Sequence, residues 1–435
     1  MTRRLSPLAA AALAGLAAAC SVGDPLVVPA TQAPPHWANA DNAAVSWPAP
    51  DWWRGFGSPR LDSLMAEAAA GNFDVAVAVA KVRQAEAQIA VAEAGLFPTL
   101  DASAELTRSR ASSAMTSSSA STTRGTPKPV YSTTHSTLAS ASYELDFWGK
   151  TAATVGGAEA SARASRFDVQ TAVLTMQSGI ATTYFEILGL AERIRLARDS
   201  VRNAEAVLAV YRDRLAAGTA TSLDVAQQES VLAGQRATLA PLERQLRQDW
   251  NALAILVGRL PAAPEDLAES LGGIQVPAVG AGLPSELLAR RPDIQSAEAA
   301  LRAASADVAV ARAAWFPSIS LTGQAGFQSL DLAKMMTHQS LLFSFGPSVT
   351  LPILDGGRIA GTVEQKRGRV DELAQTYRKA VASAFSDVEN ALVAVAKARD
   401  EVADQTQAEV TARRAFEIAR SQMAAGTVDV ATVLN

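Results

Sequence analysis

The sequence predicts an α+β fold built from two tandem structural repeats, in which very long helices follow short paired strands. The chain repeats its own motifs in the same order, which indicates a duplicated architecture. Ranges 150–217 and 356–425 contain no proline and space their apolar residues as coiled-coil helices do. Four shorter segments alternate between apolar and polar residues, as strands with two different faces do.

The composition favours helix packing over a thick globular core. Of the 435 residues 49% are hydrophobic, but only 6% are aromatic and alanine is abundant, so most apolar surface comes from small side chains. Small side chains suit close contact between helices. The net charge of -4 gives no electrostatic basis for binding a nucleic acid, so we exclude that class of partner.

The N-terminus has the layout of a secretory signal peptide over residues 1–19. Arg3 and Arg4 precede an apolar stretch at 8–19, and Cys20 follows it. The stretch is too short for a membrane span, which needs roughly 20 apolar residues. Because Cys20 is the only cysteine, no disulfide can form within the chain.

The internal repeat is visible in two pairs of segments. Residues 211–219 read YRDRLAAGT and residues 419–427 read ARSQMAAGT, at an offset of 208. Residues 74–98 parallel residues 293–317 at an offset of 219. The offset changes where a Ser/Thr-rich run lengthens the first copy, as a surface loop tolerates. The predicted organisation is a signal peptide at 1–19, an N-terminal segment at 20–60, a first repeat at 61–258, a linker at 259–284 and a second repeat at 285–435.

Short alternating segments predict two strands in each copy. Apolar residues occupy every second position, for example at Leu100, Ala102, Ala104 and Leu106. Segments of about ten alternating residues are typical of a transmembrane barrel, whose strands face lipid on one side and water on the other. Any half-buried antiparallel sheet alternates in the same way, so alternation alone leaves both interpretations open. The predicted strands are 99–110, 131–146, 318–329 and 340–354.

The long helices carry the apolar seam of a coiled coil. Steps of three and four residues separate the apolar positions of the first helix, with a stutter between Ile180 and Tyr184. These positions are Val169, Val173, Met176, Ile180, Tyr184, Ile187, Ala191, Ile194, Val201, Ala204, Leu208, Tyr211 and Leu215. The second helix repeats the spacing at Val381, Phe385, Val388, Leu392, Val395 and Val402.

Each long helix ends in an Ala-Ala-Gly-Thr turn. We expect Gly218 and Gly426 to adopt the left-handed conformation that ends a helix. We expect Thr219 and Thr427 to cap the helix that returns from the turn. Pro241 lies within the returning helix of the first copy, where it predicts a kink or a local end rather than a domain boundary.

The second copy is shorter than the first. Asn435 corresponds to Gln227, so the returning helix that matches 227–257 is absent from the second copy. A helix hairpin without this limb exposes its apolar seam to water. We therefore expect the chain to be a C-terminal truncation or a fragment of a longer protein, with impaired assembly.

Several dispersed motifs occur in a fixed order along the mature chain. They are DWWRGF at 51–56, VRQA at 82–85, RRPDI at 290–294, Phe316-Pro317 and the Ala-Ala-Gly-Thr turns. This set resembles the outer-membrane factor family of TolC-like channels, and specifically its NodT-type efflux lipoprotein branch. The resemblance implies a homotrimer, in which each protomer gives four strands to a shared outer-membrane β-barrel and its long helices to a continuous α-helical periplasmic barrel.

The resemblance implies the function of an outer-membrane duct in a tripartite efflux system. Such a duct exports small molecules and drugs passively. It is driven by an inner-membrane pump of the resistance-nodulation-division type, which a periplasmic adaptor protein couples to the duct. Segments 30–59 and 259–284 correspond to the family's equatorial belt.

The resemblance also implies a lipid anchor. Residues 16–20 resemble a lipobox, although Ala17 stands where a bulky aliphatic residue is usual. Cys20 then carries a covalent lipid that attaches the protein to the outer membrane, and Ser21 fits transport to that membrane. An ordinary cleavage site beside a lone thiol is the alternative. We expect no other cofactor.

The family places acidic residues just after each helix turn, where they ring the periplasmic end of the channel. Asp224 matches one such position, whereas two further positions fall on Thr432 and Asn435, which predicts a gate with less charge. Asp429 is a weaker gate candidate near a helix start. The alternative for Asp224 is a solvated first-turn carboxylate that the helix dipole favours.

No constellation of residues predicts catalysis or a metal site. His36, His135 and His338 are far apart in the sequence and lack ligand spacing. The Ser/Thr-rich run contains no nucleophile motif, and no glycine-rich phosphate loop is present. Three alternatives stay open: a duct for type I protein secretion, a coiled-coil lipoprotein scaffold without a pore, and a lipid-anchored envelope hydrolase.

Overall fold

The chain forms two compact units, and each unit contains segments of both sequence repeats. The sheet unit contains Val79–Asp168 and Ser296–Tyr377, and the helical unit contains Ala30–Ala78, Val169–Gln295 and Arg378–Asn435. The predicted signal peptide and Cys20 lie outside the described residues. This computed structural model describes residues 28–30, 33–39, 47, 49–110, 131–264, 267, 269–277, 280, 282–425 and 427.

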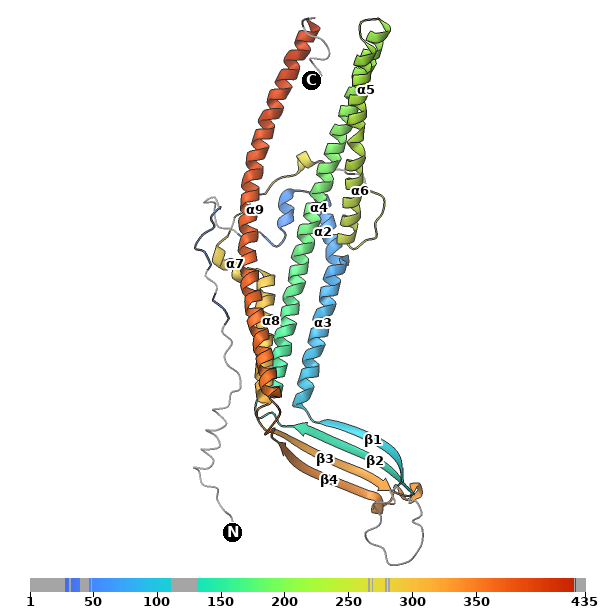
Figure 1. The fold of residues 1–435 in the computed structure, drawn as a ribbon, viewed down its shortest axis with the longest axis vertical. Helices are drawn as coiled ribbons and strands as arrows, with labels where there is room; N and C mark the ends of the chain where they lie inside the picture. The colour runs from blue at the N-terminus through green and yellow to red at the C-terminus, as the bar shows by residue number, and fades with distance from the viewer. Residues whose placement is uncertain are drawn as a thin grey trace, which may run out of the picture. The chain divides into compact units, whose positions relative to one another are not determined.

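The sheet unit contains a four-stranded antiparallel sheet in the order β1-β2-β3-β4 (Figure 1). These strands occupy the four segments whose alternation predicts them, but β2 and β4 end before residues 146 and 354. β2 ends early because the N–H of Phe147 donates to the carbonyl of Leu145, which closes a turn ahead of the next helix. The strands are β1 Thr99–Arg110, β2 Tyr131–Glu144, β3 Ser318–Ser329 and β4 Leu341–Thr350.

Helices make up most of the remaining described chain. The two longest, α4 and α9, both contain 67 residues, and each of them follows a pair of strands (Figure 1). The repeat in the sequence is therefore also a repeat in the structure. The helices are α2 Pro59–Gly71, α3 Phe73–Glu93, α4 Lys150–Ala216, α5 Ser222–Ala237, α6 Leu239–Leu256, α7 Pro284–Arg290, α8 Pro292–Ala313 and α9 Arg358–Ala424.

An aspartate starts each of the two long helices. The Asp146 carboxylate accepts a hydrogen bond from the N–H of Ala152 at 2.9 Å, and the Asp355 carboxylate accepts one from the N–H of Ile359 at 2.8 Å. The N–H groups of the first turn have no partner inside a helix, so a carboxylate can accept their hydrogen bonds. Its negative charge also interacts favourably with the helix dipole. The bond from Ile359 contributes most to holding the pKa of Asp355 below its usual value.

A ladder of ion pairs joins α4 to the returning limb that α5 and α6 form. Successive pairs lie seven residues apart along α4, and seven residues apart in the opposite direction along the returning limb. Exposed pairs contribute little stability each, but this spacing is that of a heptad repeat. Between the pairs, Val201 and Leu208 pack against Leu232. The ion pairs are Arg198–Glu243, Glu205–Arg236 and Arg212–Glu229.

The returning limb is interrupted at Thr238, three residues before Pro241. Proline lacks an N–H and crowds the preceding turn, so the limb divides into two helices there. The ion-pair ladder continues across the interruption to Glu243. The break is therefore a local end within one limb, in line with the prediction.

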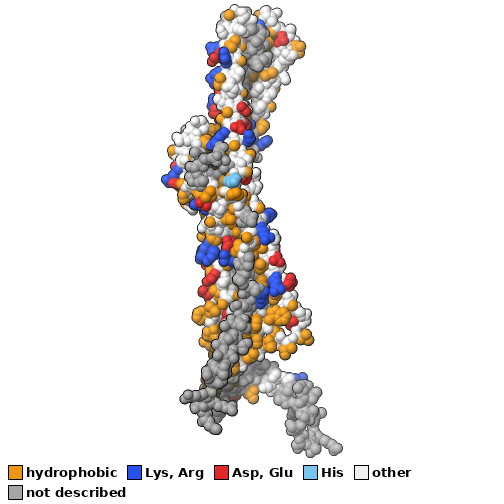
Figure 2. Space-filling view, turned by 90° about the vertical axis from the view of Figure 1, so that its left-hand side faces the viewer, with side chains coloured by type: hydrophobic (Ala, Val, Ile, Leu, Met, Phe, Trp, Pro, Cys, Tyr) orange, Lys and Arg blue, Asp and Glu red, His pale blue; other side chains and the backbone are white. Residues whose placement is uncertain are grey.

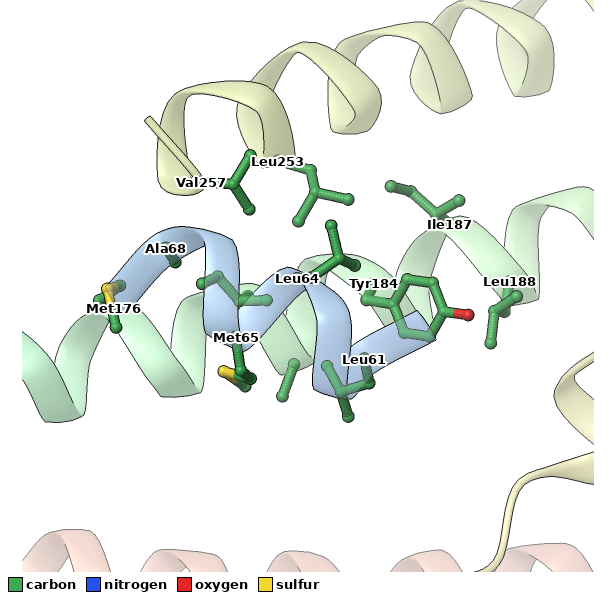
Figure 3. Packing of buried hydrophobic residues seen from close by; sticks show 12 residues of the cluster. Leu61, Leu64, Met65, Ala68, Met176, Tyr184, Ile187, Leu188, Leu253 and Val257 are labelled. Atoms are coloured by element: carbon green, nitrogen blue, oxygen red, sulfur yellow. The ribbon is translucent and has the colours of Figure 1, made fainter. Parts of the chain in front are cut away.

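A hydrophobic core joins α2, α4 and α6 in the helical unit (Figure 3). Leu61 of α2, Ile187 of α4 and Leu253 of α6 are at most 1% exposed. Burying a side chain of this size stabilises the fold by roughly 1.5–3 kcal/mol. Several seam positions that the heptad spacing predicts for α4 are buried, namely Met176, Ile180, Tyr184, Ile187, Ile194, Val201 and Leu208.

The Glu269 carboxylate fastens the segment 269–277 to this core. It accepts hydrogen bonds from the Ser58 hydroxyl, from the N–H of Arg60 at 3.1 Å and from the Tyr184 hydroxyl at 2.9 Å. Burial alone would raise the pKa of Glu269, but these three donors lower it below its usual value. Burial is the largest cause that raises the pKa of Tyr184 from 10.0 to about 12. Glu269 therefore stays charged and bonded at neutral pH.

The seam of α9 has few partners among the described residues. Val381 is 3% exposed, whereas Val395 is 51% and Val402 is 65% exposed. Figure 2 shows hydrophobic side chains exposed among charged ones on one face of the helices. Beyond Leu392, α9 presents an apolar seam that no described part of this chain covers.

Gly258 ends α6 at a φ of 80°, and a Cβ built there would lie 2.0 Å from the carbonyl oxygen of Gly71. Gly258→Ala should therefore lower the free energy of unfolding by roughly 1–3 kcal/mol, through backbone strain and this clash. Gly234 lies inside α5 with no atom within 4 Å of an added Cβ. Gly234→Ala should raise the free energy of unfolding by roughly 0.5–1 kcal/mol. Denaturant unfolding followed by circular dichroism measures both variants, and equal effects would contradict the strained helix end.

Candidate functional site

One face of the sheet is apolar and exposed. The strand register brings Ala102, Ala139, Ala325 and Phe343 into one row across all four strands. Exposure is high along this apolar face, at 76% for Leu100, 81% for Phe343 and 73% for Phe345. A soluble antiparallel sheet covers such a face with a second layer, whereas a membrane barrel turns it toward lipid. The apolar residues of this face are Leu100, Ala102, Ala104, Leu106, Ala139, Ala141, Tyr143, Ile319, Leu321, Ala325, Phe327, Leu341, Phe343, Phe345 and Val349. Thr133, His135, Thr137 and Ser329 lie on the same side of the sheet.

The opposite face of the same sheet is polar and acidic. Its rows consist mainly of serine, threonine and glutamine, for example Asp101, Ser140, Gln324 and Ser344. This polar face carries the carboxylates Asp101, Glu105 and Glu144, and within the described strands it carries no Lys, Arg or His. Side chains of this kind suit a water-filled interior and favour cations over anions there.

The dimensions of the sheet fit the thickness of a membrane. On β2, Tyr131 and Tyr143 close the two ends of the face that bears the apolar residues, twelve residues apart. At about 3.4 Å per residue and a tilt of about 45°, they lie roughly 29 Å apart across a bilayer. The hydrocarbon core of a bilayer is about 30 Å thick, and aromatic residues gather at its two boundaries.

Aromatic side chains gather where the strands meet the helices. Trp148 stacks on Phe316 with ring centroids 4.9 Å apart, and its Nε1–H donates to the carbonyl of Pro317 at 2.7 Å. Phe147 is 64% exposed and Trp315 is 52% exposed. Rings with one polar group and a large apolar body favour the membrane–water boundary. This end of the sheet therefore has the character of a membrane interface.

Among the described residues, β1 pairs only with β2 and β4 pairs only with β3, so both edges of the sheet are open there. Unpaired backbone groups cost several kcal/mol each in hydrocarbon, so membrane-spanning sheets close into barrels. Four strands cannot close alone, and in lipid the edges of this sheet require strands from other chains.

The turn after α4 forms the second candidate site, and it lies in the helical unit. Gly218 has a φ of 72°, as predicted for the residue that ends the helix. Its N–H donates to the carbonyl of Leu215, and the N–H of Thr219 donates to the carbonyl of Arg214 at 2.8 Å. This pair of bonds is a Schellman motif, which satisfies the last carbonyls of α4.

The prediction that Thr219 caps the returning helix is wrong. Its hydroxyl donates backward to the carbonyl of Arg214, and Thr221 is the N-cap of α5 instead. Thr427 bonds in the same backward direction, with its N–H and hydroxyl both on the carbonyl of Gln422. A residue that directly follows a helix-ending glycine donates its hydrogen bonds to carbonyls of the preceding helix. It is therefore not available to cap the next helix.

Asp224 forms a capping box with Thr221. The Asp224 carboxylate accepts the N–H and the hydroxyl of Thr221, both at 2.8 Å, and the N–H of Asp224 donates to the Thr221 hydroxyl oxygen at 3.2 Å. The N–H of Thr221 contributes most to lowering the pKa of Asp224. The carboxylate is therefore ionised and partly exposed at the turn while it also starts α5.

The remaining predicted residues are placed as follows. Cys20, Gly426, Asp429, Thr432 and Asn435 lie outside the described residues. The structure brings Gly218, Thr219 and Asp224 together at one turn. In the part of the chain that the structure describes, no group of three or more His, Cys, Asp or Glu side chains converges on a common point.

Sequence reasoning missed two sets of residues. Thr221 was missed although it stands three residues before Asp224, which is the spacing of a capping box. Asp101 and Glu105 were missed because the apolar positions alone predict the strand, although the positions between them alternate with equal regularity. The alternation that predicts one face of a strand also fixes the other face.

The chain matches the profile of the family described as outer membrane efflux protein over residues 64–259 and 283–435. It is 40% identical over 383 residues to the pyoverdine export outer membrane protein OpmQ of Pseudomonas aeruginosa, across 88% of this chain and 80% of that protein. It is 29% identical over 424 residues to the cation efflux system protein CusC of Escherichia coli K12, across 96% and 89% of the two chains.

The fold is also that of solved outer membrane channels. The open state of the MtrE outer membrane channel of Neisseria gonorrhoeae superposes with a TM-score of 0.80 at 29% identity, across 95% of this chain and 91% of that one. These likenesses confirm the predicted fold class and the predicted location in the outer membrane. Because the profile covers most of its length, the chain belongs to the outer membrane efflux protein family.

Proposed function

We propose that the chain is one protomer of a homotrimeric duct through which small molecules leave the cell passively. The observation that carries this proposal is the two-faced sheet, which is apolar on one side, acidic on the other and open at both edges. The apolar face contacts lipid, and the polar face lines a bore filled with water. A coiled-coil scaffold without a pore would leave the exposed apolar face without a purpose.

Edge pairing between chains closes the barrel. β4 of one chain pairs with β1 of the next, so three chains of four strands give twelve strands. Barrels of eight strands are filled by side chains and those of sixteen hold an aqueous channel, so a larger barrel with a polar interior favours an open bore. The exposed seam of α9 at Val395 and Val402 offers a helical contact in the same assembly.

The duct provides only the passage across the outer membrane, and other proteins drive the transport and select the substrate. OpmQ is named for pyoverdine export and CusC for cation efflux, yet both resemble this chain over most of its length. A shared architecture with different cargo is expected where an inner-membrane pump of the resistance-nodulation-division type selects the substrate. A periplasmic adaptor protein joins that pump to the helical end of the duct.

The N-terminal segment anchors the duct to the membrane through lipid on Cys20. Described residues of this segment pack against α9 within the helical unit. The N–H of Ala38 and the Asn39 amide donate to the Glu389 carboxylate, each at 2.7 Å. The Trp37 ring lies 5.7 Å from that of Phe385, between centroids. The segment that follows the anchor is therefore fastened to α9.

Conductance of the purified, complete protein in planar lipid bilayers tests this function. We expect a trimer that conducts ions and prefers cations because of the acidic polar face. Replacing Asp101→Asn and Glu105→Gln together should lower the permeability ratio of cations to anions. Ser103→Ala lies between them on the same face and should leave the ratio unchanged. A monomeric protein, or one that passes no ions, would show that the proposal is wrong.

The orientation of the sheet can be tested with two adjacent residues of β2. Ala139 lies on the apolar face and Ser140 on the polar face. Ala139→Arg should destabilise the barrel by roughly 2–4 kcal/mol, because an arginine then faces lipid near the bilayer centre. Ser140→Arg should still insert and should shift the channel toward anions. Folding into liposomes, read from heat-modified mobility on gels, separates the variants, and equal insertion of both contradicts the assigned faces.

Asp224 is proposed to bind cations at the periplasmic entrance as well as to start α5. Asp224→Asn removes the charge, so it should weaken block of the channel by divalent cations added on the helical side. Thr221→Ala removes the cap but keeps the charge, so the block should persist while the thermal stability of the hairpin falls. If both variants leave the block unchanged, Asp224 has no role in the entrance.

A further inference from the structure

A basic and aromatic cluster lies at the ends of β1 and β2 that are remote from α3 and α4. The guanidinium carbon of Arg108 lies 5.5 Å from the centroid of the Tyr131 ring, and that of Arg110 lies 5.9 Å from it. Arg110 and Tyr131 are register partners on the two strands. Attraction between a cation and the ring face holds both guanidinium groups near one ring. We call Arg108, Arg110 and Tyr131 the end cluster.

The end cluster lies on the same side of the sheet as the apolar face. Arg108 follows Leu106 by two residues along β1, so both side chains point to one side of the strand. Leu106 is 66% exposed and Tyr131 is 56% exposed. On this side of β1, an exposed apolar side chain, Leu106, is therefore followed two residues later by a positively charged one, Arg108.

The two arginines have no carboxylate partner within the described residues. The ladder arginines Arg198 and Arg212 each pair with a glutamate, whereas no ion pair forms at Arg108 or Arg110 in the part of the chain that the structure describes. The nearby strand carboxylate Glu105 lies on the polar face and accepts the Thr107 hydroxyl at 2.7 Å. Within the described residues, these two positive charges, which stand two positions apart on one strand, therefore lack a counter-charge.

The chemistry of the end cluster and its position across the bilayer both indicate which ligand it binds. A guanidinium group presents a planar fork of donors that matches phosphate oxygens. The end cluster lies where the roughly 29 Å span between Tyr131 and Tyr143 reaches the boundary of the hydrocarbon, which is the level of the headgroups. A lipid supplies phosphate and acyl chains together, which matches the neighbouring Arg108 and Leu106, whereas a free phosphate ion matches only the arginines.

We propose that Arg108 and Arg110 bind the phosphate of an anionic lipid headgroup at the membrane boundary remote from the long helices. Tyr131 holds the two guanidinium groups in place for it. This inference rests on the proposed orientation of the apolar face toward lipid. It adds a specific lipid partner and a means of fixing the depth of the barrel in the membrane.

The test measures lipid retention by the complete trimer with native mass spectrometry. The protein is equilibrated in mixed micelles that contain equal amounts of phosphatidylglycerol and phosphatidylcholine. We expect the parent to retain phosphatidylglycerol preferentially, and the double variant Arg108→Ala with Arg110→Ala to lose roughly tenfold of that preference. The double variant Arg108→Lys with Arg110→Lys should keep part of it, because the charge stays but the fork is lost.

A matched control uses two exposed arginines of α9, Arg399 and Arg414, which likewise form no ion pair within the described residues. Replacing both by alanine should leave the preference intact. An equal loss in this control, or no loss in the Arg108 and Arg110 double variant, overturns the proposal. Full displacement of the lipid by inorganic phosphate at the same concentration also overturns it, because the site then binds a free ion.

Conductance separates this inference from the proposed function. The double variant Arg108→Ala with Arg110→Ala should still form trimers and conduct ions, because neither residue lies on the polar face. If this double variant conducts ions and keeps the lipid preference of the parent, the headgroup site is wrong but the proposed duct still stands. If the parent protein does not conduct ions, the proposed duct function is wrong, whatever lipid the protein retains.

Discussion

The edges of the four-stranded sheet, which no described strand of this chain pairs, set the main constraint on how the protein assembles. In hydrocarbon, each unsatisfied N–H or C=O group costs several kcal/mol, so β1 and β4 need neighbours. The internal duplication supplies a simple rule for finding them. Within a chain, β2 and β3 join the first repeat to the second. In the proposed assembly, pairing β4 with β1 of the next chain would join a second repeat to a first in the same way, so a ring would close by repeating one kind of junction.

Structural elements with a repeat that extends over many residues could be predicted from the sequence, because many residues independently indicate the same period. The seam of α4 was predictable from its heptads, and the ladder from Arg198 to Arg212 confirms that spacing in a second, independent set of residues. The turn at Gly218 was predictable for a different reason, since a glycine after the last apolar turn ends a helix. Its φ of 72° bears this out.

Local competition between neighbouring residues was harder to predict. Thr219 and Thr221 are chemically alike and both stand near the start of α5, so residue type alone could not assign the cap. The Schellman motif decided the matter, because it uses the residue directly after Gly218. Long-range polar contacts were also hidden from sequence reasoning. Nothing local indicates that Glu269 meets Ser58 and Tyr184, which are distant in the chain.

The period of two along β1 explains how opposite charges serve different purposes on one short strand. Asp101 and Glu105 lie on the polar face, whereas Arg108 and Arg110 lie on the other. Successive side chains point to opposite sides of the sheet, so the backbone separates carboxylates from guanidinium groups that are three residues away in sequence. Were these charges on one face, they would neutralise one another as ion pairs. In the proposed duct, this separation lets the acidic side set the electric field inside the bore while the basic side stays available to lipid phosphate, and a substitution on one side need not affect the other.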